Sequence, residues 1–212
     1  MTTTKSRRLP RAVRERQMLD AAVAVFAEHG YHAASMDEIA ERAGISKPMV
    51  YAYLGTKEEL FVACIHRESE ALMTAVAERI VGDMAPDERL WQGLRAFLGF
   101  VAAHRDAWIV LYRQARAQGV PFAGEVEQSR SRVVDAVSAL LGGAAERMEP
   151  GPVKGDLAAM ATALVGAGEA LADWIADHPD ADPEVAAARL MNLVWLGFGT
   201  LLTGARWTPP TA

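Results

Sequence analysis

Several residue types that define other protein classes are scarce in this chain. Its 212 residues include one cysteine, Cys64, which excludes an internal disulfide and a cysteine-rich zinc site. This usage fits a reducing compartment, so we expect a cytoplasmic protein with Cys64 as a buried filler of a helical pattern. The first residues contain no apolar core segment, and no secretory signal is predicted. The longest uncharged apolar run, Leu190–Ala205, is shorter than the ~18–20 residues of a membrane-spanning helix, so we predict a buried helix and no membrane partner.

Patterns typical of enzymes are also missing. The five histidines are scattered and lack metal-ligand spacing. There is no glycine-rich phosphate loop and no GxSxG motif. Asp173 and Asp177 lie four residues apart on one helical pattern, which is more typical of a solvated face than of a catalytic pair. The sequence therefore predicts no enzyme activity, no catalytic residue, no metal and no cofactor.

Charge is distributed unevenly along the chain. The net charge is −5, which does not by itself indicate nucleic-acid binding. Residues 1–16 nevertheless hold six Lys or Arg against one Glu, and residues 61–212 hold thirteen basic against nineteen acidic residues. A basic arm (residues 1–11) followed by an acidic body favours DNA contact confined to one end. A merely solvated arm explains the charge equally well.

The stretch Ser35–Leu60 contains the most informative local pattern. It reads SMDEIAERAGISKPMVYAYLGTKEEL. Ser35 with Glu38, and Thr56 with Glu59, fit capping boxes at two helix starts. Between them, a short helix Met36–Ala43, a break at Gly44 and a second short helix from Ser46 predict a helix-turn-helix, which reads DNA through its second helix.

An amphipathic helix over about Ala12–Glu28, ended by Gly30, completes the predicted three-helix core. Val50 and Leu54 face inward from the second short helix, so its remaining side chains suit the major groove. Lys57 lies at the next helix N-terminus, where the exposed N–H groups favour phosphate. The predicted DNA-binding residues are Ser35, Met36, Ser46, Lys47, Pro48, Met49, Tyr51, Ala52, Tyr53 and Lys57.

These residues carry a family resemblance. The segment Arg16–Phe61, with QMLDAAVAVFAEHGY, DEIAERAGISKPMVYAYL and TKEEL, resembles the tetracycline-repressor-like (TetR) transcriptional regulators over about a fifth of the chain. It departs from the family at Leu54, where phenylalanine is usual, and at Ala52, where an aromatic residue often meets the DNA backbone. The resemblance implies a homodimer with two DNA-reading units and a C-terminal helical ligand domain.

The remainder of the chain has no strand signature, and the predicted fold is all-α with about nine helices. A connecting helix Lys57–Val81 is followed by helices over about Pro86–Ala103, Asp106–Gln118, Ala123–Leu141, Asp156–Asp177 and Pro183–Thr203. Gly142-Gly143 is expected to end one helix, and Glu149–Gly155 is expected to be a linker. The predicted divisions are a basic arm 1–11, a helix-turn-helix domain 12–56, a connecting helix 57–81, a ligand-binding and dimerisation domain 82–206, and a tail 207–212.

Two sets of body residues are candidates for binding. Apolar stripes with a few polar groups are typical of ligand pockets, although the same stripes also suit an ordinary core. The pocket candidates are Phe97, Val101, His104, Trp108, Tyr112, Arg116, Met160 and Leu164. The last two helices are apolar on most faces, so they need cover on more than one side, as a four-helix dimer interface would provide. The interface candidates are Ala167, Leu171, Trp174, Leu193, Leu196 and Thr200.

Together these observations predict a homodimeric, ligand-responsive transcriptional regulator, which we expect to be a repressor. Its partners would be a palindromic double-stranded DNA operator, a second copy of the chain and a small-molecule effector that releases the DNA. One alternative is a helical module that binds a small molecule or protein but no DNA. An all-α enzyme is the third hypothesis, and it would require turnover of a bound ligand.

Overall fold

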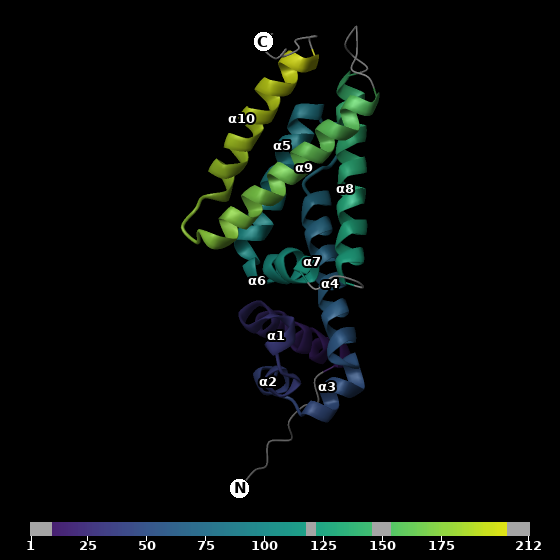
Figure 1. The fold of residues 1–212 in the computed structure, drawn as a ribbon, viewed down its shortest axis with the longest axis vertical. Coiled ribbons are helices and arrows are strands. Elements are labelled where there is room, and N and C mark those ends of the chain that lie inside the picture. Colours follow the sequence, from purple (N-terminus) through teal and green to yellow (C-terminus); the bar gives the residue numbers. More distant parts are fainter. Residues whose placement is uncertain (1–9, 118–121, 146–153, 203–212) are drawn as a thin grey trace, which may run out of the picture. The chain divides into compact units, whose positions relative to one another are not determined.

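The fold was analysed in a computed structural model, which describes residues 10–117, 122–145 and 154–202 (Figure 1). The described residues are helical and contain no strand, as predicted. When the contiguous segment α6–η1–α7 counts as one helix, the described residues form nine helices. Their bounds are α1 (Arg11–Ala33), α2 (Met36–Arg42), α3 (Lys47–Leu54), α4 (Lys57–Ala77), α5 (Pro86–Ala103), α6 (Arg105–Trp108), π-helix η1 (Ile109–Gln114), α7 (Ala115–Ala117), α8 (Phe122–Ala145), α9 (Lys154–Asp177) and α10 (Pro183–Leu202).

The chain divides into two compact units, which are described separately. The first contains the residues up to Glu68 together with Ile109–Val126, and the second contains Ser69–Trp108 and the residues from Glu127 onward. The first unit thus combines the predicted helix-turn-helix domain with a segment from the predicted C-terminal domain. Across the described residues, no helix is both apolar enough and long enough to traverse a bilayer.

The core of the first unit is built around aromatic side chains from distant parts of the chain. Phe26 and Phe61 are fully buried, with ring centroids 4.8 Å apart in an edge-to-face arrangement. Phe122 packs edge-to-face against Phe61 at 4.9 Å, and Tyr31 lies 5.1 Å from Phe122. Such pairs add stabilisation beyond the burial of apolar area. This cluster holds α1, the start of α4 and the start of α8 in one core.

The ends of several helices differ from those predicted. Gly30, with φ 78° and ψ 162°, breaks α1 as expected, but a further helical turn follows and reaches Ala33. The connecting helix α4 ends at Ala77 rather than Val81. There Arg79 and Ile80 donate backbone hydrogen bonds to carbonyls three residues earlier, and Gly82 follows with φ 73°. Tightened last turns of this kind cannot be read from apolar spacing.

The predicted helix Asp106–Gln118 is interrupted by the π-helix η1, which sequence spacing did not indicate. Within the first unit, η1 packs against α1. The Gln114 side-chain amide donates a hydrogen bond to the Phe26 carbonyl of α1 at 2.5 Å. A π-turn changes which side chains face the neighbouring helix, so Val110, Leu111 and Ala115 all become buried.

The second unit packs α5 against both α9 and α10, which Figure 1 shows side by side. Leu98 and Val101 of α5, Ala172 and Ile175 of α9, and Ala187 of α10 are buried. Gly142-Gly143 does not end α8, and α9 begins at Lys154 inside the predicted linker. Leu141 and Leu157 meet in a small apolar cluster with Ala161. Burial of these residues outweighs the low helix propensity of the two glycines.

Candidate nucleic-acid interface

The turn between α2 and α3 has a backbone geometry that only a few residues adopt readily. Gly44 has φ +67°, a left-handed conformation that glycine accepts without steric cost. The Gly44 N–H donates to the Glu41 carbonyl at 3.0 Å, and the Ile45 N–H donates to the Ala40 carbonyl at 3.0 Å. Ile45 then packs against the core. The two helices are therefore held at a defined angle, as a helix-turn-helix requires.

The helix α3 presents a polar outer side. Its inner side is held by Val50, which is fully buried, while Leu54 packs on the core. Pro48 lies in the first turn, where a missing N–H leaves no helical hydrogen bond unmade. Ser46, Pro48, Tyr51 and Ala52 are exposed, and Lys47, Met49 and Tyr53 are half-buried. An exposed turn with hydroxyls and a cation can reach base edges and phosphates.

The N-terminus of α2 contributes less side-chain surface than predicted. Ser35 is its N-cap, with the hydroxyl oxygen accepting from the Asp37 N–H at 3.1 Å. Met36 is 6% exposed and lies in the core, so its side chain is not available to DNA. Glu38 does not complete a capping box with Ser35, because its carboxylate pairs with His29 and Arg42.

Two arginines of α1 lie beside α3. The Arg11 guanidinium lies over the ring of Tyr53, 5.2 Å from its centroid. The Arg14 guanidinium lies 3.7 Å from the sulfur of Met49. Both residues add positive charge next to the exposed side of α3. Arg14 was not among the predicted DNA-binding residues. Its position three residues after Arg11, on the same helix face, could have indicated from the sequence that it lies beside Arg11.

Lys57 is held by the first unit's own groups. Its ammonium donates to the His32 carbonyl at 3.0 Å and lies 5.0 Å from the centroid of the Tyr31 ring. Burial lowers the pKa of Lys57. The preceding capping box is complete, since the Thr56 N–H donates to Glu59 at 2.7 Å and the Glu59 N–H donates to the Thr56 hydroxyl at 3.2 Å. Hydrogen bonding of Thr56 to the carboxylate, chiefly from its backbone N–H, lowers the pKa of Glu59.

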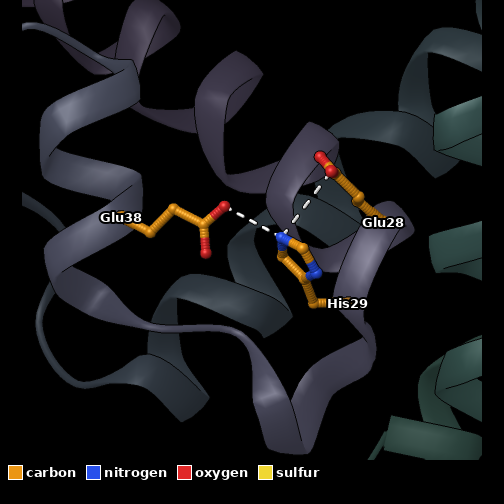
Figure 2. Close-up of side chains that lie close together, drawn as sticks. All are labelled: Glu28, His29 and Glu38. Atoms are coloured by element: carbon orange, nitrogen blue, oxygen red, sulfur yellow. Dashed lines mark hydrogen bonds and ion pairs between the residues drawn. The ribbon is translucent and has the colours of Figure 1, made fainter.

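A cluster of charged side chains joins α1 to α2 on the surface (Figure 2). The His29 Nε2 atom lies between two carboxylates, 2.9 Å from Glu38 and 3.8 Å from Glu28. Arg42 pairs with the same carboxylates at 3.4 Å and 2.8 Å, and its hydrogen bond holds the pKa of Glu28 below its usual value. Glu28, His29 and Glu38 have potential metal-ligand atoms within 4.8 Å of one another, and they are the only such group of three in the described part of the chain. Arg42 already supplies the positive charge there, so we assign the cluster to helix docking rather than to metal binding.

The predicted pocket residues are divided between the two units. Tyr112 and Arg116 belong to the first, where the Arg116 guanidinium lies 5.6 Å from the Tyr112 ring centroid. The other six belong to the second unit. There Phe97 packs edge-to-face on Trp108 at 5.5 Å, and Val101 and Leu164 are buried. Met160 packs near Leu157, and the ring of exposed His104 lies tilted against Phe100, with the centroids 4.6 Å apart.

Polar groups accompany these apolar residues in the second unit. The indole N–H of the fully buried Trp108 donates to Asp173 at 2.9 Å. The Arg130 guanidinium donates to the buried carboxylate of Glu169 at 2.9 Å. Neither Arg130 nor Asp173 was among the predicted pocket residues. Their signal was the presence of charge on otherwise apolar helix faces.

A shallow depression of about 560 Å³ lies on the surface of α4 and is wide open to solvent. Its walls include Thr56, Glu58, Val62 and His66. None of the predicted pocket residues contributes to it. Since it is open and partly acidic, it lacks the enclosed apolar character of a ligand site.

Large apolar side chains are exposed on the last two helices. Leu193 and Leu196 of α10 are 73% and 70% exposed, and Trp174 of α9 is 42% exposed. Ala167 and Leu171 are half-buried on α9. Thr200 lies on α10, but its side chain is outside the described residues.

Comparison with known proteins finds two matching families along the chain. Residues 86–197 match the family "Tetracyclin repressor-like, C-terminal domain", and residues 18–64 match "Bacterial regulatory proteins, tetR family". A TetR-like transcriptional regulator of known structure from Rhodococcus sp. RHA1 is 47% identical, with a TM-score of 0.79. The alignment covers 91% of this chain and 99% of that one.

Two further proteins show similarity over shorter lengths or lower identity. The HTH-type transcriptional activator FasR of Mycolicibacterium smegmatis is 34% identical over 137 residues, which are 65% of this chain and 63% of FasR. The chain thus matches less than two thirds of the length of this curated relative. AibR, solved in complex with isovaleryl coenzyme A and operator DNA, shares the fold at 21% identity and a TM-score of 0.69, over 85% of this chain and 97% of AibR.

Proposed function

Because the chain belongs to the TetR family of transcriptional regulators, we propose that it binds a palindromic operator as a homodimer and leaves the DNA when a small molecule binds its C-terminal domain. The observation that carries the DNA part is the exposed outer side of α3, held by the Gly44 turn and by buried Val50. The assignment to a family of transcription regulators removes the enzyme hypothesis.

The exposed apolar surface of α9 and α10 supports the homodimer. Leu193, Leu196 and Trp174 leave a large apolar area in contact with water. Each Å² of such area removed from water contributes about 25 cal/mol, so a second copy that covers this surface gains stability. A dimer would also place two helix-turn-helix units about 34–36 Å apart, one turn of the DNA helix, as a palindromic site requires.

The effector is proposed to bind in the second unit, among the apolar side chains near Trp108. Two polar groups lie in the same unit: Asp173, which accepts the Trp108 indole N–H, and Arg130, which pairs with Glu169. The effector must bind the DNA-free conformation more tightly than the DNA-bound one, because equal affinity for both would shift nothing. Release of DNA by ligand corresponds to a repressor, although the relative FasR is named an activator. A thermal-shift screen that includes coenzyme A thioesters, the ligand class named for AibR, would identify the effector.

The DNA proposal predicts that Lys47→Ala and Tyr51→Ala each weaken operator binding by about tenfold, since one base or phosphate contact is worth roughly 1–3 kcal/mol. The measurement is a gel shift with DNA upstream of the protein's own gene. Glu78→Ala, which changes an exposed residue just after α4, is the control and should leave the affinity unchanged.

Circular dichroism would show that each variant is folded. Unchanged operator affinity in a folded Lys47→Ala or Tyr51→Ala protein would contradict the assignment of α3 as the DNA-reading helix. The absence of any salt-sensitive, sequence-specific band with the wild-type protein would instead favour the helical binding module without DNA binding.

A further inference from the structure

A carboxylate lies among the predicted DNA-binding residues, where it opposes DNA phosphates. Asp37, in the first turn of α2, accepts a hydrogen bond from the ammonium of Lys47, the first residue of α3, at 2.8 Å. The Asp37 side chain is 71% exposed and that of Lys47 is 43% exposed. The N-termini of the two helices therefore converge at this ion pair.

Stability is a poor explanation for an ion pair this exposed, since such pairs contribute little to folding. An acidic group next to the exposed side of α3 also repels the DNA backbone, so it lowers affinity for every duplex. The pair raises the pKa of Lys47, chiefly through the hydrogen bond that its ammonium donates to Asp37, and the lysine stays charged. A role in DNA recognition accounts for an acidic residue at this place.

The backbone around the pair is well defined. The Asp37 N–H is held by the Ser35 hydroxyl at 3.1 Å, which anchors the start of α2. The Ile45 N–H donates to the Ala40 carbonyl at 3.0 Å, which anchors the turn just before Lys47. Because both backbones are anchored, the carboxylate restricts where the Lys47 ammonium can lie.

We propose that Asp37 is a positioning residue that determines specificity, because it holds the Lys47 ammonium and offsets its charge until a fitted DNA site competes for it. This inference rests on the proposed DNA binding. On arbitrary DNA, contact depends mainly on charge, and the neutralised lysine contributes little. On a matching site, base contacts from α3 bring a phosphate or base acceptor close enough to bind the ammonium.

The test compares Asp37→Asn with Glu41→Gln. Both changes remove one negative charge from α2, but Glu41 has no contact with Lys47 among the interactions of the described residues and is exposed. The probes are a duplex enriched from a random library by the wild-type protein and the same duplex with its sequence shuffled. Affinities are measured by fluorescence anisotropy over a series of KCl concentrations.

For Asp37→Asn, the affinity for the shuffled duplex should rise about threefold to tenfold, and the salt dependence should steepen by about one released ion, because Lys47 becomes free to bind phosphate. The affinity for the enriched duplex should change less than about twofold, so the specificity ratio falls. Glu41→Gln should leave that ratio unchanged. Asp37→Glu keeps the charge and should keep the wild-type specificity ratio. In a Lys47→Ala background, Asp37→Asn should no longer change the specificity ratio.

Several results would overturn the inference. One is an unchanged specificity ratio in folded Asp37→Asn, and another is an equal fall of the ratio in Glu41→Gln, which would indicate a general charge effect. The inference would also be overturned if Asp37→Asn still lowered the specificity ratio in a Lys47→Ala background. If the wild-type protein enriches no sequence from the library, the proposed operator binding itself fails, and this inference fails with it.

Discussion

Lys47 and Lys57 carry the same charge but have different partners. Lys47 pairs with a carboxylate at the exposed start of α3, and Lys57 donates to a backbone carbonyl and lies against an aromatic ring. A phosphate can replace the carboxylate at Lys47 at little cost, because an exposed pair is weak. To bind a phosphate, Lys57 would lose its cation–π contact with the Tyr31 ring. At the scale of single residues, Lys47 is therefore the better placed of the two for DNA.

Cys64 has the properties of a core residue rather than a reactive one. It is fully buried in the first unit, and burial raises its pKa to about 12. The thiol rather than the nucleophilic thiolate thus persists through neutral pH. Burial of the neutral thiol therefore stabilises the folded state at neutral pH. Because the folded pKa is raised, this stabilisation is lost as the pH rises above the ordinary thiol pKa towards 12.

We therefore expect native protein to react with a colorimetric disulfide reagent at pH 8 at least about 100-fold more slowly than protein unfolded in guanidinium chloride. The unfolded sample is the control for reagent and thiol content. Equal rates in the two samples would show that Cys64 is accessible in the folded chain.

At the scale of elements, the start of α4 depends on a reciprocal cap. Gly55 precedes it with φ +71°, and a Cβ at this position would meet the Glu59 carboxylate. Thr56 and Glu59 satisfy each other's backbone N–H groups. This arrangement ends α3 and begins α4 within two residues, which sets the direction in which α4 leaves the helix-turn-helix.

Thr56→Ala should lower the free energy of unfolding by about 0.5–2 kcal/mol, because it removes the hydroxyl that accepts from Glu59. Urea denaturation at pH 7 measures the change. Thr56→Ser keeps the hydroxyl and should stay within about 0.5 kcal/mol of the wild type.

The effect of the same cap should depend on pH. The pKa of Glu59 is lowered in the folded state, so its contribution is present above the usual carboxyl value of 4.5 and is lost as the pH falls through the lowered pKa. Wild type should therefore be more stable than Glu59→Gln at neutral pH, and this stability difference should narrow in strong acid, where the Glu59 carboxylate is protonated. A constant difference across that range would show that Glu59 does not take part in the cap.

The π-helix η1 is the element that departs most from a regular pattern. Its Gln114 side chain donates a hydrogen bond to the Phe26 carbonyl at 2.5 Å, and its Val110 and Leu111 are buried in the first unit. A regular α-helix has 3.6 residues per turn, so over the same residues it would give these side chains different orientations relative to α1. The extra residue of the π-turn is therefore what fits this segment to the core.

At the scale of the whole molecule, the exposed surface of α9 and α10 is the feature that a single chain leaves unexplained. Leu193 and Leu196 are 73% and 70% exposed and lie three residues apart, on one side of α10. Contiguous exposed apolar surface of this kind is typical of an interaction site. A second copy of the same surface is the partner that the proposed homodimer requires.

The double substitution Leu193→Asp and Leu196→Asp should raise the dimer dissociation constant at least about 100-fold, because it places charges in an apolar interface. Sedimentation equilibrium measures the change, and far-ultraviolet circular dichroism confirms that the helices remain. Val185→Asp, which changes an exposed residue at the other end of α10, is the comparison. An unchanged dimer in the double variant would place the interface elsewhere.

The sequence by itself determined the helices and the helix-turn-helix. Their signals are local: apolar residues three and four apart, the glycine at 44, and the Thr56–Glu59 cap all lie within one or two helical turns. The inward orientation of Val50 follows from the same spacing, and the structure confirms it. The family resemblance depended on this local stretch, and the family match confirms it.

Only the tertiary structure decided which groups meet across the chain. The partner of Lys47 lies ten residues away, and the carbonyl that receives the Gln114 amide lies 88 residues away. Met36 was among the predicted DNA-binding residues, and the packing of the first unit buries it. Such outcomes depend on how distant segments pack, because burial and pairing are properties of the folded surroundings rather than of the neighbouring sequence.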